Sequence, residues 1–191
     1  YDDFLTRRRE LIARVVREAF VTLDAPVETE TKKDDAIVAD LLAEGEGMNV
    51  EFKSTLRVNL HTGEKDPRME LAVLRTIAGF LNSRNGGTLC IGVDDSGEAV
   101  GLEADGFPNE DRFNLHLDNL IRDRIGPQFM MYIHPHFADH DGKRVLLVEC
   151  SPARSAAYVK DGKDERFYVR GGASTSELTM SQAEKYIAER F

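Results

Sequence analysis

Residues 80–95, FLNSRNGGTLCIGVDD, decide the fold class of this chain. The stretch begins in the last turns of an apolar-striped segment, residues 67–83, whose i, i+3, i+4 spacing predicts a helix that faces a core. Gly86-Gly87 predicts a turn, and TLCIGV has the length and apolar character of a buried strand. Asp94-Asp95 ends that strand and predicts a tight turn into a returning strand at residues 98–102. This order of elements indicates a protein that mixes helices and strands.

The sequence before this stretch predicts one strand and two helices. NVEFKST (49–55) is a strand in which Val50 and Phe52 face one side while Glu51 and Lys53 face the other. A short helix is expected over 36–43, preceded by a polar linker over 23–33. Residues 4–22 have helical spacing of their apolar side chains, and their arginines lie mostly on the other side.

The sequence after it predicts four strands between two helices. A helix over 109–125 ends at Gly126-Pro127. Two hairpins follow, the first pairing 128–139 with 143–150 and the second pairing 156–160 with 166–170. A last helix is expected over 181–191, capped by Ser181.

These elements predict an α+β fold, a mixed β-sheet flanked by helices, with an extra N-terminal helix. We expect two parts: residues 1–33 as an N-terminal helix and linker, and residues 34–191 as the main domain. The chain begins at Tyr1 rather than at methionine, so we expect it to continue a longer protein whose upstream region is not included.

Charge and cysteine content limit the function classes. The net charge of -9 argues against a generally basic nucleic-acid binder. Residues 51–90, however, carry six basic and four acidic side chains, and residues 151–191 carry seven and six, so a local basic surface is expected. Cys90 and Cys150 lie in apolar strands and are expected to be buried free thiols, which points to a reducing, cytoplasmic compartment. No apolar run approaches the roughly 20 residues that cross a bilayer, so no membrane association is expected.

Three groups of residues could carry chemistry. Glu46, Glu51 and Lys53 combine carboxylates with an ammonium group, which could hold a divalent metal and orient water for phosphodiester attack, although Glu and Lys at i and i+2 also form routine exposed pairs. Asp94, or Asp95 next to it, stands at a strand end and could bind a hard cation, or could simply shape the turn.

The third group could bind phosphate. Arg170 leads from a strand into a Gly-Gly and Ser/Thr-rich loop containing Ser174 and Thr175, where backbone amides, hydroxyls and a guanidinium could hold phosphate. The alternative is a plain loop with a paired arginine. Nucleic-acid contacts are also expected at basic residues of the two positive segments: Arg57, Arg84 and Lys160.

GEGMNVEFKST (45–55), FLNSRNGGTLCIGVDDSGEAVGLEAD (80–105) and FYVRGGASTSEL (167–178) occur in this order and together resemble the Schlafen-type AlbA-like domain. The resemblance implies a nucleic-acid-processing lobe. Schlafen-type nucleases cut tRNA or rRNA with Mn²⁺ or Mg²⁺, and their acids correspond to Glu46, Glu51 and Asp94, with Lys53 matching the lysine of the motif. Vertebrate Schlafens pair two such lobes, so a single lobe is expected to form a homodimer.

Three functions therefore remain open. The first is a metal-dependent endoribonuclease acting on structured RNA such as tRNA, with RNA favoured over DNA. The second is a non-catalytic DNA- or RNA-binding regulatory or defence module. ATP binding, implied by the family's divergent ATPase-like label, is the weakest of the three because the chain has no phosphate-loop string. If three carboxylates meet at one metal, we expect Glu51→Gln to melt no lower than the wild type without metal, because repulsion is relieved.

Overall fold

The structure is a computed structural model that describes residues 28–191, with side chains described from residue 35 onward. The chain divides into two units, residues 1–33 and 34–191, and the second contains the elements discussed below. The helix predicted over residues 4–22 lies outside the described residues.

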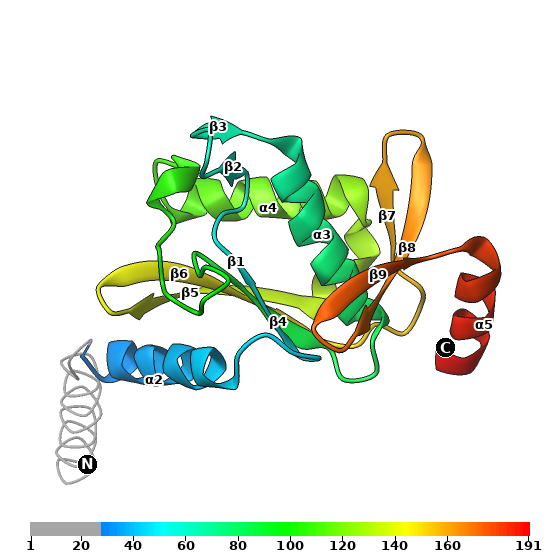
Figure 1. The fold of residues 1–191 in the computed structure, drawn as a ribbon, viewed down its shortest axis with the longest axis horizontal. Helices are drawn as coiled ribbons and strands as arrows, with labels where there is room; N and C mark the ends of the chain where they lie inside the picture. The colour runs from blue at the N-terminus through cyan, green and yellow to red at the C-terminus, as the bar shows by residue number, and fades with distance from the viewer. Residues whose placement is uncertain (1–27) are drawn as a thin grey trace, which may run out of the picture. The chain divides into compact units, whose positions relative to one another are not determined.

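A four-stranded mixed sheet forms the centre of residues 34–191 (Figure 1). Its order is β1 (Val50–Lys53), β4 (Gly87–Ile91), β6 (Lys143–Cys150) and β5 (Ile133–His140). β1 runs parallel to β4, and the other neighbours are antiparallel. β5 is an edge strand, which is where Pro135 can be accommodated because proline has no amide hydrogen to donate. The carboxyl ends of β1 and β4 therefore meet at one edge of the sheet.

Helices cover both faces of this sheet. On one face, α3 (Pro67–Asn82) and α4 (Glu110–Arg124) bury their apolar stripes against Leu89 and Ile91 of β4. On the other face, α2 (Glu28–Glu44) packs Val38 into a second core cluster that contains alternate side chains of the same strands: Val50, Phe52, Cys90 and Leu147. The predicted α+β fold with a mixed sheet flanked by helices is confirmed.

A second, three-stranded antiparallel sheet lies beside α3. It consists of β7 (Tyr158–Asp161), β8 (Asp164–Gly171) and β9 (Ser174–Leu178) and leads into α5 (Met180–Arg190). Asn82 joins this sheet to α3. Its buried side-chain amide donates to the carbonyl oxygens of Ala157 and Tyr168, and its side-chain oxygen accepts from the backbone amide of Ala157.

The second sheet corrects the expected loop after Arg170. Residues 174–178 form β9, although a Ser/Thr-rich segment after two glycines suggested irregular structure. The side chains of this strand are partly or fully exposed, and the strand is fixed by backbone pairing with β8 and by contacts of Thr175 with Arg170 and of Glu177 with Arg166.

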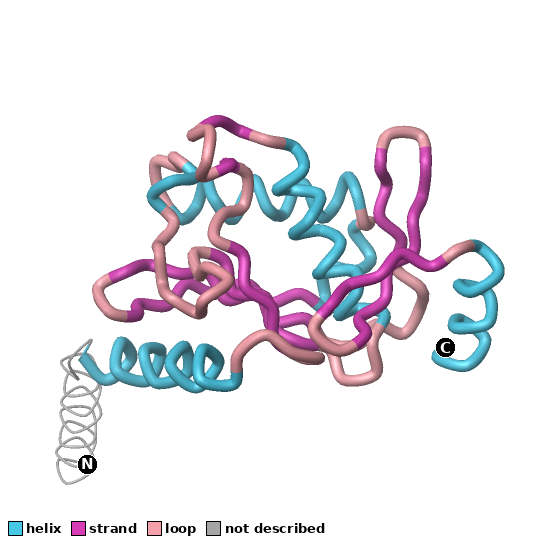
Figure 2. Tube along the Cα trace, viewed as in Figure 1, coloured by secondary structure: helices cyan, strands magenta, loops and turns pink. Residues whose placement is uncertain are grey.

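Three further predictions were wrong in detail (Figure 2). In addition, residues 56–66, over which no helix or strand was predicted, contain a short hairpin of β2 (Val58–Asn59) and β3 (Glu64–Lys65). The expected strand at 98–102 is reduced to one bridge, and the 3-10 helix η1 (Glu103–Asp105) follows it. The expected strand over 128–139 begins only at residue 133, since the 3-10 helix η2 (Pro127–Tyr132) comes first. The expected linker over 23–33 is helical from residue 28, because its Glu and Lys residues are good helix formers.

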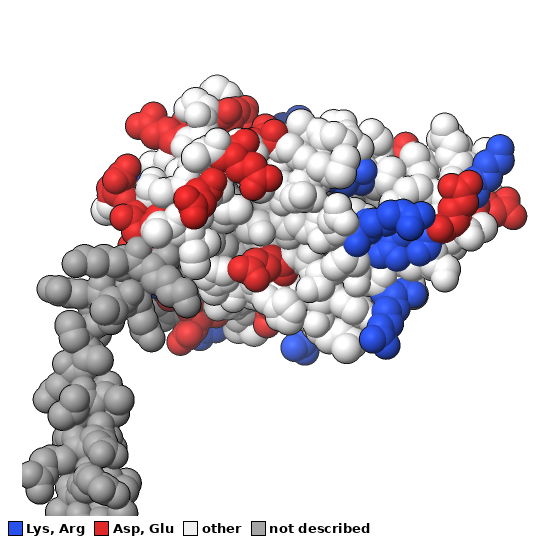
Figure 3. Space-filling view, turned by 90° about the horizontal axis from the view of Figure 1, so that it is seen from below, with Lys and Arg blue, Asp and Glu red and all other residues white. Residues whose placement is uncertain are grey.

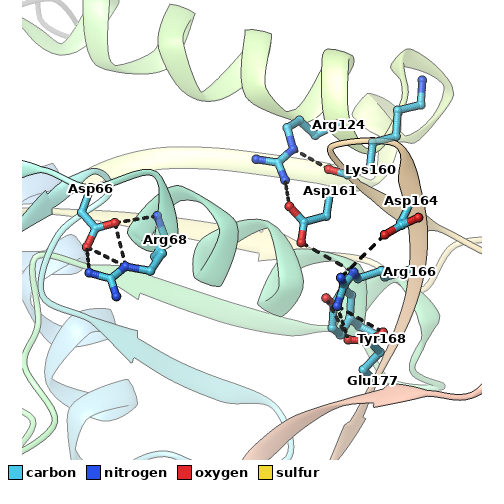
Figure 4. Close-up of polar contacts among 9 residues, drawn as sticks. All are labelled: Asp66, Arg68, Arg124, Lys160, Asp161, Asp164, Arg166, Tyr168 and Glu177. Carbon is cyan, nitrogen blue, oxygen red and sulfur yellow. Dashed lines mark hydrogen bonds and ion pairs between the residues drawn. The ribbon is translucent and has the colours of Figure 1, made fainter.

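The helix caps follow ordinary capping chemistry. α5 is capped by Thr179 rather than by the expected Ser181, because Thr179 and Gln182 form a reciprocal capping box. α3 begins at Pro67 after the cap residue Asp66, whose carboxylate accepts from the backbone amide and the guanidinium of Arg68 (Figure 4). The hydrogen bond from the Arg68 side chain lowers the pKa of Asp66 to about 2.

We predict that Asp66 makes stability depend on pH only under strongly acidic conditions. Its pKa is about 2 in the folded chain, against roughly 3.9 when unfolded, so its contribution is fully present above about pH 4 and is lost as pH falls through the folded pKa. Titration of the side-chain carboxyl by ¹³C NMR measures this directly. Arg68→Gln should move the Asp66 pKa toward its ordinary range, and a wild-type pKa near 4 would contradict the assignment.

Candidate nucleic-acid interface

Glu51 and Lys53 lie on the α3 side of β1, because Val50 and Phe52 occupy the α2 side. The Lys53 ammonium donates to Glu51 Oε1 at 2.6 Å and to the carbonyl oxygen of Phe52 at 2.8 Å. The Lys53 side chain is 27% exposed and the Glu51 side chain 12%. The pair therefore forms a half-buried charged cluster at the carboxyl end of β1, as the strand periodicity predicts.

Arg170 joins this cluster from the second sheet. Its Nη1 lies 2.6 Å from Glu51 Oε2, and its side chain is fully buried. The guanidinium also donates to the carbonyl oxygens of Gly47 and Val50, and it lies 5.3 Å from the ring centroid of Phe80. Glu51 Oε2 is buried, and its contact with Arg170 is an ion pair rather than a well-aligned hydrogen bond. Arg170 lies within β8, in line with the predicted strand over 166–170, and its guanidinium donors are used by groups inside the protein.

The structure does not bring the three expected metal ligands to a common point. Glu46 Oε1 accepts from the backbone amide of Phe52 at 3.0 Å. Asp94 Oδ1 accepts from Ser96 Oγ and from the amides of Ser96 and Glu98, so it closes its own turn. The hydrogen bond from the Ser96 hydroxyl holds the pKa of Asp94 below its usual range. Within residues 35–191, no group of three or more His, Cys, Asp or Glu side chains is placed to hold a metal ion, so this arrangement does not fit one.

The other expected phosphate contacts differ in availability. Arg57 is half-buried: its guanidinium donates to the carbonyl oxygen of Asp105 and lies 3.5 Å from the ring centroid of Phe107. Thr175 accepts from Arg170, and the exposed Ser174 hydroxyl donates to Gly171. Arg84 is exposed and donates to the carbonyl oxygen of Glu189 in α5.

Lys160 is exposed but lies next to several acids of the β7–β8 hairpin (Figure 4). The carbonyl oxygen of Lys160 accepts from Arg124. Arg166, on the neighbouring strand, contacts three carboxylates of the same sheet: Asp161, Asp164 and Glu177. These acids offset the positive charge of the hairpin. Lys160 is therefore a weaker phosphate contact than an exposed arginine without neighbouring acids.

A basic corner forms where the turn after α3 meets the end of α5. We define it by Arg84, Arg154 and Arg190. Arg190 donates to the carbonyl oxygens of Ser83 and Ala153 at 2.8 and 3.2 Å, and the exposed Arg154 directly follows Ala153. Figure 3 shows Lys and Arg side chains gathered mainly toward one end of this face, with Asp and Glu mainly toward the other.

Sequence reasoning missed Arg154 and Arg190 as members of this corner. The charge of residues 151–191 was a signal for them, but their proximity to Arg84 depends on long-range packing. The glycines of the turn serve that packing: Gly86 has a φ of +73°, and a Cβ there would lie 2.1 Å from the carbonyl oxygen of Cys150. The turn therefore passes close to the end of β6, which places Arg84 beside the segment that follows β6.

Asp105 is a second residue that sequence reasoning missed. Its buried carboxylate accepts from three consecutive backbone amides after β1, those of Leu56, Arg57 and Val58, at 2.8, 2.8 and 3.2 Å. Burial raises the pKa of Asp105, and these amide hydrogen bonds oppose the rise. The carboxylate fixes the loop that continues β1 past Lys53.

Residues 46–179 match the family model described as Schlafen, AlbA_2. The chain belongs to this family. Membership makes it a nucleic-acid-related Schlafen AlbA_2 domain, and the match covers β1, the glycine turn and the Arg170 strand. A comparison with curated proteins gives no significant match.

Solved structures resemble this Schlafen AlbA_2 domain in fold. The DIP2311 protein of Corynebacterium diphtheriae aligns with a TM-score of 0.56 and 20% identity over 85% of this chain, which spans 29% of that chain. The N-terminal domain of a putative ATP-dependent DNA helicase RecG-related protein of Nitrosomonas europaea aligns with a TM-score of 0.48 and 22% identity, over 75% of this chain and 94% of that one. At 20% identity the likeness to the DIP2311 protein concerns the fold alone, and nothing is concluded from the second alignment.

We predict that Arg170 of this domain is a stability residue. Arg170→Ala leaves Glu51 Oε2 buried beside Lys53 alone and removes the donors to Gly47 and Val50, so the free energy of unfolding should fall by about 3–5 kcal/mol. Arg166→Ala is the matched control on the same strand, because its side chain is 37% exposed and such pairs contribute about 1 kcal/mol or less. Urea unfolding measures both.

The Glu51 variant completes a double-mutant cycle with Arg170. Because Glu51 is paired with two cations rather than crowded by carboxylates, Glu51→Gln should melt below the wild type, which reverses the sequence-based expectation. Adding Glu51→Gln to Arg170→Ala should cost less than Glu51→Gln costs alone. Strictly additive losses would contradict a direct pair.

Proposed function

We propose that this domain binds RNA and that the basic corner makes the first contacts with the phosphate backbone. The observation that carries the proposal is the proximity of Arg84 and Arg154 on the surface of a chain that belongs to a nucleic-acid-related family. Both side chains are exposed, and each directly follows a residue, Ser83 or Ala153, whose carbonyl oxygen accepts from Arg190. Exposed arginines pair with phosphate in a bidentate manner, which suits a backbone contact without base preference.

The charge distribution supports one binding orientation. On the face drawn in Figure 3, Lys and Arg gather mainly toward one end and Asp and Glu mainly toward the other, so a polyanion is attracted to the first end and repelled from the second. Arg170 and Arg57 contribute little to such contacts, because Arg170 is fully buried, Arg57 is half-buried, and protein carbonyl groups accept from both guanidiniums. The preference for RNA over DNA is part of the proposal and is supported by the Schlafen resemblance.

Removing the two exposed arginines should weaken RNA binding and its salt dependence together. Each lost phosphate contact lowers the slope of log K against log salt by about 0.7 on a single strand, so Arg84→Ala with Arg154→Ala should lower the slope by about 1.4. Fluorescence anisotropy with a labelled single-stranded RNA at several salt concentrations measures affinity and slope.

The matched control removes the same charge from α4. Arg112 and Arg122 are exposed there, and the double change Arg112→Ala with Arg122→Ala should leave affinity and slope close to those of the wild type. A DNA strand of the same sequence tests the preference for RNA. Equal losses in the two double variants would show that net charge, and not the basic corner, determines binding.

A second candidate function is metal-dependent endoribonuclease activity on structured RNA such as tRNA. The observation that favours it is the contact between the Glu51 carboxylate and the Lys53 ammonium at the end of β1, together with the family resemblance. This candidate requires Glu46, Glu51 and Asp94 to come together, because in the arrangement described here they do not meet and do not fit a Mn²⁺ or Mg²⁺ ion. In the arrangement described here Glu51 pairs with Arg170, so its carboxylate would have to leave that partner.

This candidate predicts that millimolar Mn²⁺ raises the melting temperature, because a cation that binds only the folded chain stabilises it by RT ln(1 + [L]/Kd). Glu46→Gln keeps the acceptor for the Phe52 amide and removes the charge, so it should abolish the rise and any cleavage of tRNA. Glu165→Gln, an exposed acid of the β7–β8 hairpin, should change neither. Intact tRNA together with melting that ignores Mn²⁺ would leave RNA binding as the function.

The cellular setting belongs to the proposal as well. We propose a cytoplasmic homodimer, by analogy with the paired lobes of vertebrate Schlafens. Cys90 and Cys150 are free and buried, as expected, and burial raises the pKa of Cys90 to about 12, so it is an unreactive thiol. No helix within the described residues combines the length and apolar character needed to cross a membrane.

A further inference from the structure

A cavity of about 420 Å³ opens beside the charged cluster at the end of β1. Its walls come from the end of β1 and the loop that continues it, the β2–β3 hairpin, the first turns of α3 and Asp95 in the turn after β4. Volumes of this size hold a small organic ligand, and the carboxyl ends of parallel strands are a usual place for ligand sites. The proposed contacts of RNA with the basic corner do not use this cavity, and the nuclease candidate involves only Lys53 of its walls.

The walls combine apolar surface with a few polar groups. Val58, Leu60, Met69 and Ala72 supply the apolar part, and Leu60 is 53% exposed although it is apolar. Polar groups lie around them, including the Lys53 ammonium, the Asp95 carboxylate and the His61 imidazole. An apolar slot edged by hydrogen-bonding groups suits a flat heteroaromatic ring that carries exocyclic donors and acceptors.

Among the residues that line the cavity, Lys53 carries the positive charge and Asp95 the negative one. Glu51 is shared between two cations, Lys53 and Arg170, so it does not neutralise Lys53 completely. An ammonium group has three protons, and the contacts of Lys53 with Glu51 and with the Phe52 carbonyl use two of them. The third can donate to a phosphate at the cavity entrance.

The cavity is held open by contacts that do not depend on a ligand. Asp105 binds the amides of residues 56–58 and so fixes the loop on one side. Asp66 caps α3 on the other side, close to Met69. A preformed site avoids the entropic cost of ordering its walls when a ligand enters.

We infer that this cavity accepts one unstacked nucleotide, with the base against Leu60, Met69 and Ala72 and the phosphate at Lys53. The inference rests on the proposed RNA-binding function and names a substrate-binding subsite for it. Extruded bases are held between aromatic or apolar side chains and by hydrogen bonds to their edges, and here the apolar side chains would supply the contact with the base face. The nucleotide can come from a strand or be free in solution, and the two sources share this chemistry.

The test uses the ¹⁵N-labelled chain and two probes, AMP and a short single-stranded RNA, with ribose 5-phosphate as the probe that lacks a base. Both nucleotide probes should shift the amide signals of residues 53–61 and 69–72. Ribose 5-phosphate should bind at least about fivefold more weakly than AMP, because it lacks the base whose apolar faces the cavity would bury, and burial of a few CH₂-sized groups contributes roughly 1 kcal/mol or more.

Variants separate the cavity from the basic corner. Ala72→Leu fills the cavity without changing charge. It should abolish the AMP shifts and lower the salt slope of RNA binding by no more than the one phosphate contact at Lys53, about 0.7. Leu60→Ala should weaken AMP binding, whereas Leu115→Ala, which removes a leucine of similar exposure (48% against 53%) from α4, should not. Thermal melting checks that each variant is folded, and Leu60→Ala carries the test if Ala72→Leu does not fold.

The results with RNA and with AMP distinguish the cavity inference from the proposed RNA binding. Shifts at the cavity with RNA but not with AMP assign the nucleotide to a strand, and the reverse assigns it to a free nucleotide and overturns RNA binding there. RNA binding that depends on Arg84 and Arg154 but never shifts the cavity amides overturns the cavity inference and leaves the proposed function standing. If neither probe binds, both the proposed function and the cavity inference fall.

Discussion

The buried contact between Glu51 and Arg170 is the constraint on which the rest of this domain depends. It joins the central sheet to the second sheet across 119 positions of sequence, and neither charge has free access to water. A buried charge is tolerated only when it is paired and hydrogen-bonded. The carbonyl groups of Gly47 and Val50, the ring of Phe80 and the Lys53 ammonium meet that requirement together. The segment that precedes β1, the helix α3 and the second sheet must therefore all be in their native positions for this contact to form.

The fold class was predictable because it depends on periodic patterns. The apolar stripe of α3 and the alternation of β1 each bury one defined face, β4 buries both of its faces, and the structure has all three elements. Two of the wrong predictions share a cause. In β9 and η2 the local preference is weak or misleading, so pairing with β8 or packing of neighbouring elements decides the conformation.

In the candidate site, only the contacts between residues close together in the sequence were predictable. Glu51 and Lys53 are two residues apart on one strand, so their contact follows from strand geometry alone. Asp105 and Arg170 bind groups that lie about 50 and 120 positions earlier in the sequence, and no spacing rule reveals such partners. Asp94 shows the opposite problem. A carboxylate at a strand end has two uses, and here its oxygen closes the turn through three hydrogen bonds.

The acidity of the chain and its proposed partner are compatible because charge acts locally in salt solution. The screening length is about 8 Å at physiological ionic strength, which is shorter than a domain of this size. A phosphate at the basic corner therefore interacts mainly with Arg84, Arg154 and Arg190, and hardly with the acids that gather toward the other end of that face. The electrostatic effect of the cluster of Glu51, Lys53 and Arg170 reaches a still shorter distance, because two of its three charges cancel each other. Salt can then weaken the first contact strongly while the cavity, whose walls are largely apolar, keeps its selectivity for the shape of a base.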